Sequence, residues 1–187
     1  MLGLQSQAET NTQKVAGSTA ERFTELYKQY VPKVFKYMTY KVAGDVQIAE
    51  DLTSLVFEKA LTKFKSHDAE KASFSTWIFA IARNTVIDHY RATSKQKNLQ
   101  LDDDTCAPRD SISPEDNAIK TEEFQTLQSF ILRLSQHEQE IISLKFGAEM
   151  NNRQIAKMTG LSESNVGTII WRAVCKLRDN FRKWENG

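Results

Sequence analysis

The 187-residue sequence is poor in the residues that form turns and in the residues that bind metals. It contains 7 Gly and 3 Pro, too few for a barrel or sandwich of many short strands. Its two cysteines, Cys106 and Cys175, lie far apart, and its three histidines are scattered at His67, His89 and His137. Neither set has the spacing of a disulfide framework or a zinc site. We therefore expect no metal ion and no cofactor.

Long apolar runs are also missing. No stretch approaches the roughly 18 apolar residues that a membrane-spanning helix needs. Residues 1–18 are rich in Gln, Ser and Thr and lack the basic and apolar segments of a secretory signal. These absences predict a cytoplasmic protein without stable membrane insertion, and they predict that residues 1–18 form a disordered tail.

The net charge of +1 conceals an uneven distribution along the chain. Residues 20–97 carry 13 Lys and Arg against 9 Asp and Glu, residues 98–120 carry 2 against 6, and residues 121–187 carry 9 against 8. Contact with phosphate depends on such local clustering more than on the total charge. The acidic segment includes Asp102–Asp104 and two of the three prolines, a composition typical of a linker.

Apolar residues recur at helical spacing on both sides of this linker. Before it, the pattern predicts helices from Phe23 to about Met38, from an N-cap at Asp45 to Phe64, and from an N-cap at Ser73 to about Arg91. The polar stretch 65–73 reads as a loop. After the linker, helical spacing resumes near residue 124, and Ser135 and Glu138 match a capping box.

The predicted fold is therefore all-α, with two small helical domains joined by a flexible acidic linker. We assign residues 1–18 to the tail, 19–94 to the first domain, 95–118 to the linker and 119–187 to the second domain.

Residues 152–171 match a helix-turn-helix template. Ala156 is small where two helices cross, Gly160 suits the turn between them, and Val166 belongs to the buried face of the second helix. The second helix of such a unit points its N-terminal residues at base edges in the major groove. The residues that would face DNA are Ser162, Glu163, Ser164, Asn165, Gly167, Thr168, Trp171 and Arg172. A helical hairpin with a chance glycine is the plainer alternative, and Trp171 can either face DNA or pack on the preceding helix.

Aromatic and basic residues interleave around the third predicted helix. Rings can stack on unpaired bases while cations follow the backbone, and an Asn amide can pair with a base edge. The candidate nucleic-acid contacts are Lys65, Lys71, Trp77, Arg83, Asn84, Asp88 and Arg91. In the alternative interpretation Trp77 belongs to the core with Phe74, and the charged residues form a solvated face. Composition favours the core for Phe74 and leaves both options open for Arg83 and Asn84.

The order of these segments resembles that of extracytoplasmic-function (ECF) sigma factors. Residues 20–95 are similar to region 2 of that family, and residues 120–183 are similar to region 4, with the expected linker and no region 3. The resemblance rests on the stretches Ile48–Thr53 with Val56-Phe57, Phe74–Ile78, Ile81–Asn84 with Asp88 and Arg91, and residues 134–178.

The resemblance implies a role in transcription initiation. It places Asp51, Leu52, Val56 and Phe57 on the helix that binds the β′ clamp helices of core RNA polymerase. It places the 65–73 loop where the family captures a flipped base, and Asn84, Asp88 and Arg91 on the helix facing the minus-ten promoter element. Region 4 would bind the β flap and read the minus-thirty-five element. Such factors commonly have an anti-sigma partner as well.

Two stretches depart from the family pattern. Ser54 and Leu55 replace a Gln-Glu pair in the polymerase helix. Gly167, Thr168 and Ile169 replace a Lys-Ser-Arg-like run in the recognition helix, which removes cations that would anchor phosphate. The promoter sequence therefore cannot be inferred from the family.

Two other classes of function compete with this interpretation. A free-standing helix-turn-helix regulator would usually dimerise, and it leaves the helices around Asp51 and Trp77–Arg91 without a role. An enzyme is not indicated, because the sequence has no nucleophile–base pair, no paired carboxylates and no Gly-rich phosphate loop.

Overall fold

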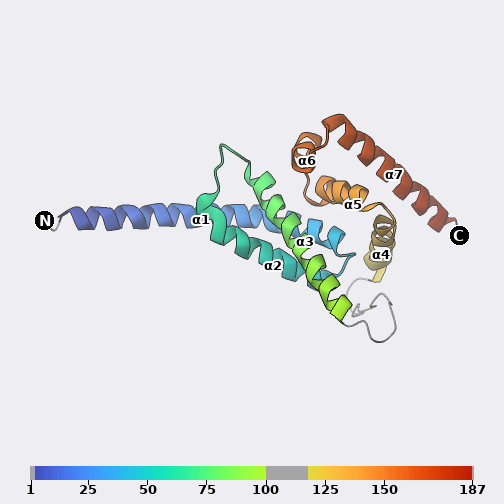
Figure 1. The fold of residues 1–187 in the computed structure, drawn as a ribbon, viewed down its shortest axis with the longest axis horizontal. Helices are drawn as coiled ribbons and strands as arrows, with labels where there is room; N and C mark the ends of the chain where they lie inside the picture. The colour runs from blue at the N-terminus through green and yellow to red at the C-terminus, as the bar shows by residue number, and fades with distance from the viewer. Residues whose placement is uncertain (1–2, 100–117, 187) are drawn as a thin grey trace.

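The computed structural model describes residues 3–99 and 118–186, and these residues form helices and connecting turns only (Figure 1). The predicted all-α class is confirmed. The elements are α1 (Gly3–Lys41), α2 (Val46–Lys63), the short 3-10 helix η1 (Phe64–Ser66), α3 (Phe74–Leu99), α4 (Ala118–Leu132), α5 (Gln136–Ile142), the π-helical turn η2 (Ser143–Gly147), α6 (Asn152–Thr159) and α7 (Glu163–Glu185). None of the described helices is both long and apolar enough to cross a membrane.

Side-chain caps fix several helix starts where the sequence predicts them. Asp45 accepts a 3.0 Å hydrogen bond from the Ile48 amide at the start of α2. The Ser73 hydroxyl accepts one of 3.3 Å from the Thr76 amide at the start of α3. Ser135 and Glu138 form the reciprocal capping box of α5. Each bond satisfies an amide that the first helical turn leaves free.

Two helix boundaries differ from the sequence-based expectation. Helix α1 begins at Gly3 and continues through Pro32, so it runs through most of the segment expected to be a tail. Extending an existing helix costs less than nucleating one, and residues 3–18 contain no proline. Helix α3 continues to Leu99 and thus includes the first residues of the expected linker. The rest of that linker, residues 100–117, lies outside the described residues.

The first three helices form a bundle around a shared apolar core (Figure 1). Its fully buried side chains include Val34, Tyr37 and Met38 of α1, Ala49, Val56 and Ala60 of α2, and Ile78, Phe79 and Ala82 of α3. Phe74 is also buried. The bundle therefore presents only its outer helix faces to partners.

Helices α6 and α7 form the predicted helix-turn-helix. Gly160 has φ 76°, in the left-handed region that favours glycine, and its amide donates a 2.9 Å bond to the Ala156 carbonyl. Ser162 caps α7 through a 3.2 Å bond from the Asn165 amide. Val166 is fully buried. Gly160 thus fixes the turn, as the sequence predicts, and Ser162 fixes the start of the second helix.

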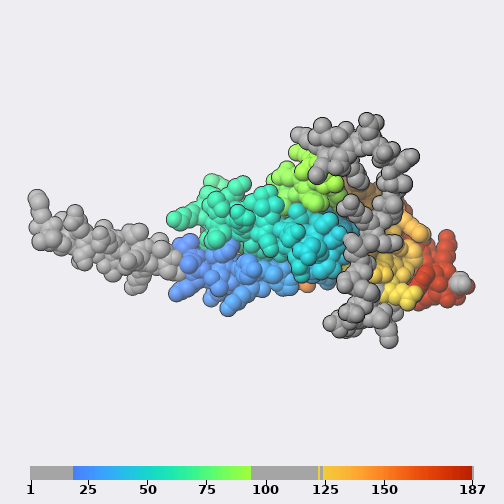
Figure 2. All heavy atoms as spheres, turned by 90° about the horizontal axis from the view of Figure 1, so that it is seen from below, coloured from blue at the N-terminus to red at the C-terminus, as the bar shows by residue number. Residues whose placement is uncertain are grey.

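The two helical units share a core, which the sequence pattern did not indicate. Ile141, Leu144, Ala148 and Met150 belong to the same buried cluster as the α1–α3 core. A Cβ at position 147 would lie only 2.8 Å from the Tyr37 Cα, so Gly147 permits the close approach of η2 to α1. Figure 2 shows the C-terminal helices lying against one end of the bundle.

Candidate nucleic-acid and polymerase interfaces

Three of the four predicted polymerase-binding residues are buried. Leu52, Val56 and Phe57 are 5%, 0% and 5% exposed and pack in the α1–α3 core. These three side chains hold α2 in the bundle. Their assignment to the polymerase contact stays a prediction. Asp51 is exposed, and its carboxylate lies 3.5 Å from the side-chain nitrogen Nε2 of Gln47.

The exposed face of α2 carries apolar residues that sequence reasoning did not assign to it. Leu55 and Leu61 are 37% and 60% exposed, and they share this face with Asp51, Ser54 and Glu58. Residue type alone does not tell which leucine of this helix leaves the core. The two residues that depart from the family pattern, Ser54 and Leu55, are both exposed here.

Trp77 belongs to an aromatic cluster of the protein itself. Its ring centroid lies 4.8 Å from that of His67 and 5.4 Å from that of Phe74, and its side chain is half-buried. The structure therefore favours the core alternative for Trp77. His67, which no sequence motif marked as part of this cluster, also hydrogen-bonds through Nε2 to the Ala72 carbonyl oxygen at 3.1 Å.

The 65–73 segment, predicted to be a loop, begins with the last two residues of η1 and bears two exposed lysines. The Asp68 carbonyl accepts bonds from the Lys71 and Ala72 amides, and the Asp68 carboxylate accepts a 3.0 Å bond from the Glu70 amide. Lys71 also forms a 3.2 Å ion pair with Asp68, while Lys65 is exposed on the same loop. The two lysines of the segment are balanced in number by Asp68 and Glu70, and Lys71 is paired with Asp68.

The outer face of α3 carries the remaining candidates of the first unit. Arg83, Asn84, Asp88 and Arg91 are all exposed. Asp88 lies 3.7 Å from Lys59 of α2, so part of its charge is neutralised. These residues are available for contact, and they share the helix whose first turn holds Trp77.

The recognition-helix candidates lie at the start of α7. Glu163, Ser164 and Asn165 are exposed in its first turn, beyond the Ser162 cap. The Thr168 hydroxyl is exposed and donates to the Ser164 carbonyl at 3.0 Å. This turn therefore presents polar side chains to solvent.

Among the later candidates of α7, some are exposed to solvent and one is partly buried against α6. Trp171 is 67% exposed, so it does not pack on the preceding helix, and Arg172 is exposed beside it. Gly167 is half-buried, and a Cβ there would lie 3.5 Å from the Asn152 side chain of α6. Gly167 thus lies near the α6–α7 contact, and its assignment as a DNA-facing residue stays a prediction.

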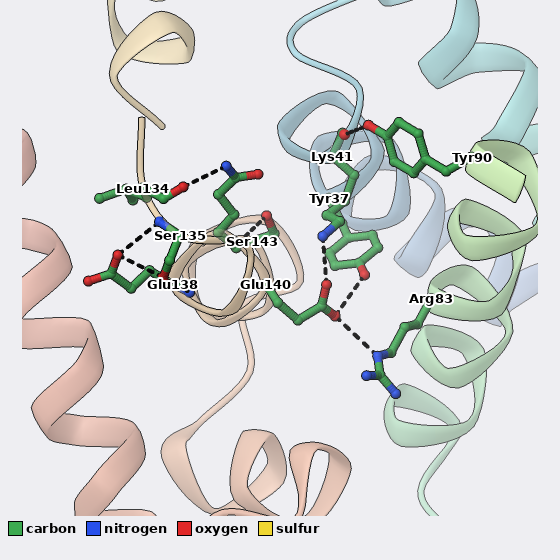
Figure 3. Close-up of polar contacts among 10 residues, drawn as sticks. Tyr37, Lys41, Arg83, Tyr90, Leu134, Ser135, Glu138, Glu140 and Ser143 are labelled. Carbon is green, nitrogen blue, oxygen red and sulfur yellow. Dashed lines mark hydrogen bonds and ion pairs between the residues drawn. The ribbon is translucent and has the colours of Figure 1, made fainter. Parts of the chain in front are cut away.

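Glu140 of α5 joins the two units through three side chains of the first (Figure 3). Its carboxylate accepts a 3.1 Å hydrogen bond from the Tyr37 hydroxyl and a 2.7 Å bond from Lys41 Nζ. Arg83 Nε lies 3.6 Å from the same carboxylate. Burial, together with the nearby Glu140 charge, raises the pKa of Tyr37 well above its ordinary value. No local pattern marked Glu140, because its partners lie far away in the sequence.

A cleft of about 1160 Å³ lies between α1, α3 and α5, and the Glu140 cluster forms part of its lining. Tyr90 and Arg91 line one side and Gln136 and His137 the other. Tyr90 also donates a hydrogen bond to the Lys41 carbonyl, which ties α3 to the end of α1. The promoter-facing candidates Arg83 and Arg91 therefore both face the second unit across the cleft.

Among the described residues, no group of His, Cys, Asp and Glu side chains is placed to hold a metal ion. Cys175 is half-buried in α7. Cys106 lies outside the described residues.

Both halves of the chain match known protein families. Residues 26–96 match the family described as Sigma-70 region 2, and residues 130–179 match the one described as Sigma-70, region 4. The chain is 30% identical over 161 residues to the ECF RNA polymerase sigma factor RpoE of Cereibacter sphaeroides. This match covers 84% of this chain and 85% of that protein. It is also 30% identical over 162 residues to the ECF RNA polymerase sigma factor BldN of Streptomyces coelicolor, covering 87% of this chain. The chain spans 61% of the length of BldN.

The fold is also similar to that of solved structures. The sigma factor RpoE from Bartonella quintana, in complex with the anti-sigma factor NepR, superposes with a TM-score of 0.68 at 19% identity. The match covers 87% of this chain and 98% of the other. At this identity the similarity concerns the fold alone.

Proposed function

The chain belongs to the ECF sigma factors of the sigma-70 family, and from that membership we propose a division of labour between its two helical units. Its function is promoter-specific transcription initiation with core RNA polymerase. In our proposal the first unit, residues 19–94, binds core polymerase and opens the minus-ten element. The second unit, residues 119–187, reads the minus-thirty-five element as duplex. The observation that carries the proposal is the match of both regions, in order, on one chain.

The outer face of α2 is the proposed contact with the β′ clamp helices. Asp51 supplies a carboxylate there, and Leu55 and Leu61 supply exposed apolar surface. Exposed apolar residues beside charged ones are typical of a protein interface. We thus assign the contact to Asp51, Ser54, Leu55, Glu58 and Leu61, with Leu52, Val56 and Phe57 as the residues that hold this face in place.

Opening of the minus-ten element is assigned to the 65–73 loop and the outer face of α3. Exposed Lys65, Arg83 and Arg91 supply cations for the backbone, and Asn84 supplies an amide for a base edge. A site that binds only the extruded form of a base shifts the equilibrium towards open DNA. The free energy of binding the extruded base at this face thereby offsets part of the cost of separating the DNA strands.

Duplex recognition is assigned to the first three turns of α7. The helix starts at a capped, exposed N-terminus, and Ser164, Asn165, Trp171 and Arg172 are accessible to a major groove. Since the Lys-Ser-Arg-like run is missing, this surface carries fewer phosphate anchors than the family pattern predicts. Base contacts should therefore contribute a larger share of its affinity.

We also propose the remaining partners and the compartment. Region 4 would bind the β flap, and an anti-sigma factor would bind the free chain, as NepR binds RpoE of Bartonella quintana. The site of action would be the cytoplasm, where core polymerase transcribes the genome. We propose no catalytic activity for the chain itself.

Run-off transcription with purified core polymerase on a genomic promoter library tests the function. We expect discrete start sites with core polymerase and this chain together, and none with core polymerase alone. Duplex binding that needs no polymerase, together with an absence of new transcripts, would instead indicate a free-standing regulator.

A further inference from the structure

We propose that His67 is a positioning residue for base capture: its ring ties together the two ends of the turn formed by residues 68–71, and so sets the shape in which the α2–α3 connection receives an extruded base. The inference rests on the proposed role of the 65–73 segment in opening the minus-ten element. It adds a residue that acts on DNA only through the backbone that it holds.

The ring of His67 closes the turn at its base. Its Nε2 atom lies 3.1 Å from the Ala72 carbonyl oxygen, across five positions of the chain. Because a carbonyl oxygen can only accept, this nitrogen carries the proton and donates the bond. His67 precedes the turn and Ala72 follows it, so the bond fixes the width of the turn's opening.

Backbone contacts give the turn its internal shape. The Asp68 carbonyl accepts bonds of 3.2 Å from the Lys71 and Ala72 amides. The Asp68 carboxylate accepts a 3.0 Å bond from the Glu70 amide. These bonds join residues of the turn to one another and to Ala72, whereas the His67 ring connects the turn to the side chains of the bundle.

Three aromatic side chains hold the His67 ring in place. The ring stacks parallel to Phe64 with 6.4 Å between the centroids, meets Phe74 edge-on at 5.8 Å and lies 4.8 Å from Trp77. Phe64 and Phe74 are themselves buried in the core. The orientation of His67 is therefore set by packing, and through its hydrogen bond the same packing sets the position of the turn.

The turn is accessible to DNA. It projects from the bundle between α2 and α3 (Figure 1), and its exposed side chains are Asp68, Ala69, Glu70 and Lys71. A loop that becomes ordered only on binding loses conformational freedom at that step, and this loss weakens its affinity. A turn that is fixed beforehand avoids the loss. The bond from His67 thus strengthens capture although its ring does not touch the base.

Three substitutions in the full-length chain separate the hydrogen bond from the ring. His67→Phe keeps an aromatic ring and removes the donor, whereas His67→Gln keeps a side-chain nitrogen that can reach the Ala72 carbonyl. His137→Phe is the control, because it makes the same change at an exposed histidine of region 4. Circular dichroism and the affinity for core polymerase verify that each variant folds and forms holoenzyme.

The measurement is a scan of the minus-ten element with holoenzyme. The probes are fluorescein-labelled copies of a promoter found by run-off transcription, mismatched across the element, each with one base of the nontemplate strand replaced by an abasic site. For wild type we expect one captured position, where removal of the base weakens binding roughly tenfold. In His67→Phe this loss should shrink to about threefold, the change expected from one hydrogen bond. His67→Gln and His137→Phe should keep most of the wild-type loss.

The position dependence distinguishes positioning from a purely structural role. A His67→Phe variant that binds every probe more weakly by one common factor, or that keeps the full loss at the captured position, would overturn the proposal. If His67→Phe does not fold, His67→Leu, which also lacks a donor, takes its place.

The proposed function fails separately, when wild-type chain and core polymerase produce no transcripts, and the role of His67 then falls with it. Transcription by wild type without any position sensitive to removal of a base would leave the function intact and overturn the role of His67 alone.

Discussion

Glu138 of α5 and Lys176 of α7 form a 2.6 Å ion pair that fixes the start of one helix to the middle of another. The same carboxylate accepts bonds from the Ser135 amide and hydroxyl in the capping box. The hydrogen bond from Lys176, ahead of those from Ser135, lowers the pKa of Glu138 from its ordinary value of 4.5. One side chain therefore supports both the local start of α5 and the packing of region 4.

This pair predicts acid sensitivity of region 4. A carboxyl whose pKa is lowered by folding stabilises the fold above its unfolded pKa, and that contribution is lost as the pH falls through the folded value. We expect the unfolding temperature to decrease at pH values below about 4.5. The loss of this partly exposed pair should lower the free energy of unfolding by on the order of 1 kcal/mol. Thermal melts of wild type and Glu138→Gln across pH 3 to 7 should converge at low pH. Glu163→Gln, at an exposed position, is the control and should not change the pH profile.

Charge reversal at Asp51 should weaken binding to core polymerase. Asp51 is exposed on the outer face of α2, so Asp51→Arg should leave the fold intact while it removes an attraction and adds a repulsion. We expect a loss of roughly 2 kcal/mol or more, as for a close charge pair at an interface. Fluorescence anisotropy with labelled chain and core polymerase measures it. Glu50→Arg changes the neighbouring exposed charge, about 100° around the helix, and should have the smaller effect. Equal affinities for wild type and Asp51→Arg would reject the assigned face.

Asn84→Ala should reduce strand opening while leaving polymerase binding unchanged. Asn84 is exposed on the outer face of α3, and loss of its hydrogen bonds to a base should cost roughly 1–3 kcal/mol. Permanganate reactivity of unpaired thymines reports opening. A promoter already mismatched across the minus-ten element removes the melting cost but keeps the base contact, so it should restore only part of the defect. Normal opening of the native promoter by this variant would show that this face of α3 is misassigned.

Trp171 should matter for DNA and hardly at all for stability. Because its side chain is 67% exposed, Trp171→Ala should change the free energy of unfolding by no more than about 0.5 kcal/mol. Closed-complex formation on duplex promoter DNA, measured by filter binding of the holoenzyme, should weaken clearly. Arg172→Ala provides the comparison: it should also soften the salt dependence of binding if it contacts phosphate. If Trp171→Ala lowered stability but left DNA binding unchanged, the Trp171 side chain would contribute to packing and not to DNA contact.

Several features were predictable because their signals are local. The caps at Asp45, Ser73 and Ser162, the capping box at Ser135 and the left-handed turn at Gly160 each depend on residues within four positions. Such contacts form between neighbours on the chain, so the sequence records them directly. The helix starts and the helix-turn-helix followed from these signals, whereas the resemblance to sigma regions 2 and 4 rested on the order of longer sequence stretches.

The assignment of faces and the joining of the two units were decided by tertiary structure. Leu52 and Leu55 are the same residue type on one helix, yet one is buried and the other exposed, because the packing of α1 and α3 selects the side of α2 that faces inward. Trp77 is held by His67 and Phe74 for the same reason. Tyr37 and Glu140 are separated by 103 positions, and no periodicity connects residues so far apart. The sequence by itself determined which helices form and where they start, since those depend on neighbouring residues. Only the folded chain could bring Glu140 to Tyr37, Lys41 and Arg83, since that contact depends on how two helical units pack.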